Sequence, residues 1–208
     1  MNNDAVLEKK KEVSEAINIL NNKELNVVQS VVLKSTIIMM LYNSVESTVT
    51  ELLTYIHDEI SSYPFSKLNR NIQNMMLDFF WSKKNTENIF DIFSDKEKFP
   101  SYDKYIEKIN LFSGNLDARK INEICKKYGI GHLTNKKQNS LLEIKTKRNQ
   151  LAHGEKLYKV ACRDMTVYDI KKLIDAVYEN LFELNNNVKK YIENKEFLCN
   201  NDKKAKII

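Results

Sequence analysis

An all-α fold is what the sequence predicts, because glycine and proline are scarce and apolar residues recur at helical spacing. The 208 residues include only 4 glycines and 2 prolines, too few for a β fold with many tight turns. Hydrophobic residues make up 42% of the chain and charged residues 29%, a balance typical of globular proteins. The length suits one domain with a sizeable core.

Two amphipathic helices are predicted in the N-terminal third. Residues 4–20 carry apolar side chains at near-helical spacing between charges. A longer helix spans about residues 26–61, and Lys34–Ser35 is where a break in it would fall. The residue before Pro64 resists the helical conformation, so this helix ends there.

Residues 65–112 are predicted to be a helical insertion. Residues 65–81 read as a helix with a methionine and aromatic stripe, and residues 89–93 form a second aromatic stretch. Such a stripe is more typical of a hydrophobic core than of a cofactor site.

Three further helices are predicted in the C-terminal half. A short helix over about 118–128 has Asn115 or Asp117 as its cap, and a second helix covers about 138–153. Thr166 and Asp169 resemble a capping box that opens a long helix with an apolar stripe reaching Tyr191. Residues 196–208 are expected to form a flexible tail.

Arg148, Asn149 and His153 are the candidate catalytic residues of the 138–153 helix. Arginine binds phosphate through a planar fork of donors, and histidine can move protons near neutral pH. Asn149 and His153 are four residues apart and share one helix face, whereas Arg148 and His153 diverge by about 140°. Two copies of the helix crossing at a dimer axis would bring Arg148 of one copy to His153 of the other.

The ordinary alternative is that Arg148 forms a surface salt bridge and that His153 caps a helix end. Glu46, among apolar residues of the long helix, is a fourth candidate. If Glu46 is buried it needs a partner, and Arg148 or His153 is the natural one. Exposure of Glu46 to solvent is the equally open alternative.

The segment from Ile144 to Gly154, IKTKRNQLAHG, resembles the signature of the HEPN superfamily: Arg, usually Asn, three to five residues, then His. Residues 41–49, 113–121 and 128–130 are also similar to the MAE-like HEPN subgroup, so the resemblance covers about residues 5–195. It implies a four-helix up-and-down bundle, with additional helices inserted between the second and third core helices. A single domain would then span residues 1–195.

The resemblance further implies a homodimer that cuts RNA without metal, as a toxin or a phage-defence effector. His153 would act as general acid or base, Arg148 would stabilise charge on the phosphoryl group, and Asn149 would orient the imidazole or contact phosphate. An antitoxin or another defence protein would be a partner. The alternative, from another class, is a non-catalytic helical module that binds RNA, nucleotide or a partner protein.

Basic residues around the motif are candidates for RNA binding: Lys145, Lys147, Lys156, Lys159 and Arg163. The net charge of +5 is compatible with a salt-sensitive attraction to the phosphate backbone.

No metal site and no cofactor are predicted. Cys125, Cys162 and Cys199 are far apart and lack the spacing of metal ligands, so buried free thiols are expected. His57, beside Asp58 and Glu59, is expected to face water. The N-terminus lacks the apolar core of a signal peptide, and the apolar run 37–42 is too short to span a bilayer. A cytoplasmic protein with no membrane partner is therefore expected.

Overall fold

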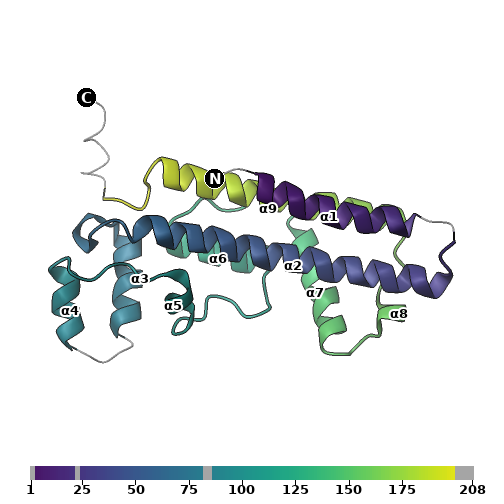
Figure 1. Cartoon of the computed structure of the whole chain (residues 1–208), viewed down its shortest axis with the longest axis horizontal. Coiled ribbons are helices and arrows are strands. Elements are labelled where there is room, and N and C mark those ends of the chain that lie inside the picture. Colours follow the sequence, from purple (N-terminus) through teal and green to yellow (C-terminus); the bar gives the residue numbers. More distant parts are fainter. Residues whose placement is uncertain (1–2, 22–23, 82–85, 200–208) are drawn as a thin grey trace. The chain divides into compact units, whose positions relative to one another are not determined.

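The computed structural model describes residues 3–21, 24–81 and 86–199. The regular structure of these residues is helical except for one isolated bridge between Leu68 and Leu198. The all-α prediction is confirmed. The elements, in chain order, are α1 (Asp4–Leu20), α2 (Val27–Ile60), the 3-10 turn η1 (Phe65–Lys67), α3 (Arg70–Trp81), α4 (Thr86–Phe93), α5 (Tyr102–Ile106), α6 (Ala118–Tyr128), α7 (Asn139–Ala152), α8 (Tyr158–Ala161) and α9 (Val167–Glu193) (Figure 1).

The chain divides into two units. Unit 1 comprises Met1–Thr48, Gly114–Lys120 and Leu133–Asn185, and therefore contains the Arg148–His153 motif. Unit 2 comprises Val49–Ser113, Ile121–His132 and Asn186–Ile208. The predicted insertion, residues 65–112, lies within unit 2.

The longer helices of unit 1 are α1, the first part of α2, α7 and the first part of α9; the short helix α8 and the first turn of α6 also belong to it. Lys10 of α1 is 2.8 Å from Asp175 of α9. The Tyr178 hydroxyl of α9 donates to Ser44 Oγ of α2 over 3.1 Å. These polar contacts flank a core of buried apolar residues that includes Val13, Ile17, Leu41, Val45, Leu141, Ile144, Val177 and Leu181.

Helix α2 runs unbroken from Val27 to Ile60, so the expected break near Lys34–Ser35 does not occur. Both polar side chains find carbonyl acceptors in the segment between α7 and α9. Lys34 Nζ donates to the Met165 carbonyl over 2.5 Å, and Ser35 Oγ donates to the Tyr158 carbonyl over 2.8 Å. Because these polar groups are satisfied, they can lie in the buried face of the helix without interrupting it.

Helix α2 is also long and apolar enough to cross a membrane by length and composition. The buried core helix of a soluble protein passes the same test. Many residues of α2, among them Ile37, Ile38, Leu41 and Ile56, are fully buried, as expected for a core helix.

Unit 2 buries His57, which we expected to face water. The side chain has no exposed surface and lies among the rings of Phe99, Tyr102, Tyr105 and Tyr128. Its Nδ1 is 2.8 Å from the Pro100 carbonyl, and its Nε2 is 2.7 Å from the Tyr128 hydroxyl. A carbonyl only accepts, so Nδ1 carries the proton and Nε2 accepts from Tyr128. Burial lowers the pKa of His57 to about 4.

The predicted helix starts at α6 and α9 are confirmed. Asp117 Oδ1 accepts the Lys120 N–H over 2.9 Å, so Asp117 is the cap of α6. At α9, Asp169 Oδ2 accepts the Thr166 N–H over 2.8 Å, and Thr166 Oγ1 accepts the Asp169 N–H over 3.1 Å. This reciprocal pair is a capping box with aspartate in place of glutamate.

The packed part of the chain extends into the segment for which we expected a flexible tail. Phe197 and Leu198 are buried, and the Phe197 carbonyl accepts the Asn69 N–H over 2.7 Å within unit 2. The remainder of the expected tail, residues 200–208, lies outside the described residues.

Candidate active site

The motif lies at the C-terminal end of α7, in unit 1. Helix α7 ends at Ala152, and His153 is its C-cap, whose N–H still donates to the Asn149 carbonyl over 3.0 Å. Gly154 follows with a φ of +70°, a conformation that a glycine adopts without steric cost. The glycine therefore ends the helix and leaves His153 at its edge.

The Arg148 side chain is held by contacts on several sides. Its Nη1 donates to Asn149 Oδ1 over 3.0 Å and to the Gly114 carbonyl over 3.4 Å. Its Nη2 is 3.9 Å from Glu46 Oε2, and only 21% of the side chain is exposed. The two alternatives for Glu46 are thereby decided: its carboxylate is half-buried and pairs with Arg148, not with His153.

Tyr42 lies beneath the guanidinium. The Arg148 Cζ atom is 4.6 Å from the centroid of the Tyr42 ring, within the range of a cation–π interaction. Tyr42 is fully buried, and its hydroxyl oxygen accepts the Leu116 N–H over 3.0 Å. Burial raises the pKa of the Tyr42 hydroxyl to about 12, so the group stays protonated at neutral pH.

The segment Gly114–Asp117 leads into α6 and contacts the motif helix at three positions. Beside the Gly114 contact with Arg148, Asn115 Oδ1 accepts from the Asn149 amide over 3.3 Å. Asp117 forms an ion pair with Lys145 in which both side chains are largely buried. The positions 145, 148 and 149 are thus held by neighbours on one side of α7.

His153 differs from Arg148 in its surroundings. Its side chain is exposed, and no other side chain in the part of the chain that the structure describes pairs with its imidazole. It continues a stripe on α7 formed by Leu142, Thr146 and Asn149, since these positions are separated by four, three and four residues. Arg148 lies about 140° from His153 around this helix.

The basic residues expected to bind RNA fall into three groups. Lys145 is neutralised by Asp117. Lys156, Lys159 and Arg163 are exposed in the segment that follows His153. Of the five cations, these last three lie exposed beside the end of the motif helix.

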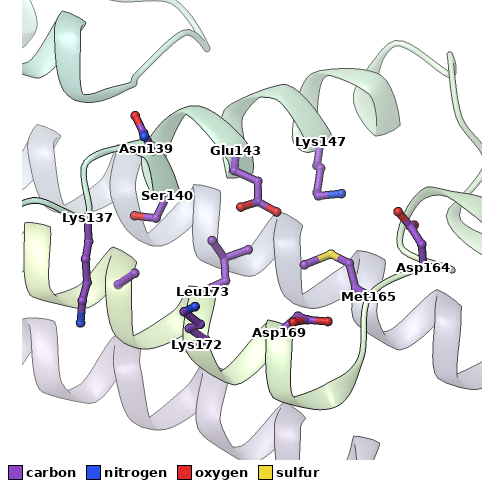
Figure 2. Close-up of a pocket in the computed structure, with 11 residues that line it drawn as sticks. Lys137, Asn139, Ser140, Glu143, Lys147, Asp164, Met165, Asp169, Lys172 and Leu173 are labelled. Carbon is purple, nitrogen blue, oxygen red and sulfur yellow. The ribbon is translucent and has the colours of Figure 1, made fainter.

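Lys147 projects from another side of α7, where it lines a pocket of about 430 Å³ between α7 and α9. Figure 2 shows Glu143 and Lys147 of α7 on one side of this pocket and Asp164, Met165 and Asp169 on the other. Since the pocket mixes acidic and basic side chains, it does not form a basic track.

Within the described residues, no group of three or more His, Cys, Asp or Glu side chains could hold a metal ion. The three cysteines are free; Cys125 and Cys162 are buried and Cys199 is partly exposed. Burial raises the pKa of the Cys125 thiol to about 11.

Sequence reasoning did not assign Tyr42, Gly114 and Asn115 to the site. Each contacts the motif from a segment more than 30 positions away in the sequence, which periodicity cannot reveal. The only available signal was the similarity of residues 41–49 and 113–121 to one family, which marked both segments but gave neither a role.

Comparison with known families supports this similarity. Residues 3–197 match the family model described as MAE_28990-like HEPN. No curated protein and no solved structure matches the chain.

Proposed function

Since the chain belongs to the MAE_28990-like HEPN family, we propose that it is a metal-independent endoribonuclease that acts as a homodimer. The observation that carries the proposal is the contrast between its two central side chains. Arg148 is fixed by Glu46, Asn149 and Tyr42, whereas His153 stands exposed and unpaired at the adjacent end of α7. A fixed cation beside a free imidazole is a suitable pair for phosphodiester transfer.

The geometry of α7 supports the proposed dimer. Arg148 and His153 diverge by about 140°, so one straight helix does not aim both at one phosphate. The exposed stripe that carries Asn149 and His153 also carries Leu142, whose exposed fraction is 49%. A two-fold axis along this stripe would cover Leu142 and bring His153 of one copy towards Arg148 of the other.

The reaction would be an attack by an RNA 2′-hydroxyl on the adjacent phosphorus. A bond forms between O2′ and phosphorus as the bond between phosphorus and O5′ breaks, which yields a 2′,3′-cyclic phosphate and a 5′-hydroxyl. One proton leaves O2′ and one reaches O5′; His153 carries one of these two protons, and solvent water takes up or supplies the other. Such a role is typically worth ~10²–10⁴ in rate. Arg148 would stabilise the negative charge on the phosphoryl oxygens.

Substrate binding would rely on the exposed cations Lys156, Lys159 and Arg163, with a contribution from Lys147 and, if its pairing with Asp117 opens, Lys145. Contacts of this kind attract the RNA backbone without reading its sequence. A biological role as a toxin or phage-defence effector in the cytoplasm is part of the proposal. An antitoxin or a second defence protein would restrain the activity.

The test is incubation of purified protein with RNA in excess EDTA, followed by analysis of the product ends. We expect cleavage that leaves a 2′,3′-cyclic phosphate and a 5′-hydroxyl, and loss of this cleavage in Arg148→Ala and His153→Ala. A strict requirement for Mg²⁺, or 5′-phosphate products, would contradict the mechanism. RNA binding without any cleavage would favour the non-catalytic helical module instead.

A further inference from the structure

A continuous set of contacts joins the segment Gly114–Asp117 and Tyr42 to the motif residues Arg148 and Asn149. The Gly114 carbonyl accepts from Arg148, Asn115 accepts from Asn149, and the Leu116 N–H donates to the Tyr42 hydroxyl. Because Tyr42 in turn lies under the Arg148 guanidinium, the segment reaches Arg148 both directly and through the ring.

We infer that Tyr42, Gly114 and Asn115 are positioning residues for the proposed catalytic site. Tyr42 and Gly114 hold the guanidinium of Arg148, and Asn115 holds the amide of Asn149. A free arginine side chain samples many rotamers, and a site that fixes it in advance avoids this loss of freedom when phosphate binds. The role in catalysis rests on the proposed function, whereas the fixing of Arg148 does not.

Tyr42 is suited to positioning and not to contact with RNA. The side chain is fully buried, and its hydroxyl is used by the Leu116 N–H. The flat ring leaves the guanidinium edge free for hydrogen bonds while it fixes the guanidinium plane. RNA would therefore meet Arg148 and not the tyrosine beneath it.

Two independent observations favour glycine at position 114. Its φ of +63° is one that side-chain-bearing residues rarely adopt. A Cβ atom there would also lie 3.1 Å from Arg148 Nη1 and 3.4 Å from Nη2. Gly154 provides a matched comparison, since its φ is +70° but a Cβ atom there would meet none of the described residues within 4 Å.

The fixing of Arg148 is tested by NMR on the ¹⁵N-labelled full chain. The sequence has four arginines, so the Nε–Hε signal of Arg148 can be assigned as the one missing from Arg148→Lys. We expect this signal to be shifted upfield by the Tyr42 ring and to exchange slowly with water, because Nε is buried away from solvent. Gly114→Ala should displace the signal, while Gly154→Ala should leave it in place.

A signal at the position of an exposed arginine, or equal effects of the two glycine substitutions, would overturn the inference. This NMR measurement needs no RNA, so its outcome is independent of the ribonuclease proposal.

The effect on catalysis is tested with Tyr42→Phe and Asn115→Ala. Tyr42→Phe keeps the ring under Arg148 and removes the hydroxyl, which accepts from the Leu116 N–H and donates to the Glu46 carboxylate. Both variants should lower kcat by about 10-fold and leave KM nearly unchanged, because the contact acts on geometry in the transition state. If the unaltered protein cuts RNA and both variants keep its full kcat, these residues do not position the site.

Discussion

The Nη2 atom of Arg148 lies 3.9 Å from Oε2 of Glu46, with 21% and 26% of the two side chains exposed. At this distance and exposure the pair contributes little to stability, below about 1 kcal/mol. Its position beside the motif instead indicates a role in orienting the guanidinium.

Glu46→Gln should therefore impair activity more than stability. The substitution keeps the shape of the side chain and removes its charge, so we expect about a 10-fold loss of kcat. The free energy of unfolding, measured by urea denaturation, should fall by less than about 1 kcal/mol. An unchanged kcat would mean that the other contacts of Arg148 suffice to orient it.

Replacement of Lys145, which pairs with Asp117, should lower the stability of the protein, whereas replacement of the exposed cations should not. Lys145→Met should destabilise the protein by about 2 kcal/mol, because it leaves the buried Asp117 carboxylate without its charged partner. Urea denaturation measures this loss.

Combined replacement of Lys156, Lys159 and Arg163 by glutamine should instead weaken RNA binding and leave stability unchanged. These side chains are exposed, and each releases a counterion from the RNA backbone when it binds phosphate. The slope of log affinity against log salt concentration should become shallower by about 2. An unaltered slope would place the RNA elsewhere on the protein.

Leu142 tests the proposed dimer face. Leu142→Arg introduces a charge into the exposed stripe of α7, and we expect it to convert the dimer to a monomer in light scattering. Leu7 of α1 is a matched control, because its exposed fraction of 50% is close to the 49% of Leu142. A dimer that survives Leu142→Arg, or that is disrupted equally by Leu7→Arg, would exclude this face.

The buried His57 makes stability depend on pH. The pKa of this group is about 4 in the folded protein and 6.5 in the unfolded chain. Between these values the unfolded chain binds the additional proton, so stability falls as the pH drops from about 6.5 towards 4. The full difference corresponds to about 3 kcal/mol.

Urea denaturation at pH 7.0 and about pH 4.5 measures this difference. His57→Gln should remove most of the decrease, whereas His132→Gln, at an exposed histidine, should retain it. A decrease that persists in His57→Gln would assign it to other groups.

Local features of the site were accessible from the sequence. The spacing of Arg148, Asn149 and His153 gave their arrangement around α7, because helix geometry fixes it. Capping by Asp117 and by the Thr166–Asp169 pair also depends on residues three positions apart.

Long-range features were not accessible. His57 precedes Asp58 and Glu59, which favoured a solvent-exposed site, but Phe99 and Pro100 cover it from 40 or more positions away. Lys34 and Ser35 similarly find their acceptors at Met165 and Tyr158. Periodicity reports which face of a helix is buried, but not which distant segment supplies the partners.

The most direct test of the composite site is a purified heterodimer of Arg148→Ala and His153→Ala chains, isolated through two different affinity tags. In such a dimer one site combines the intact Arg148 of one chain with the intact His153 of the other, and the second site lacks both. We predict that each variant homodimer is inactive and that the heterodimer cleaves RNA at about half the rate of the unaltered dimer. A heterodimer as inactive as the two homodimers would contradict the account.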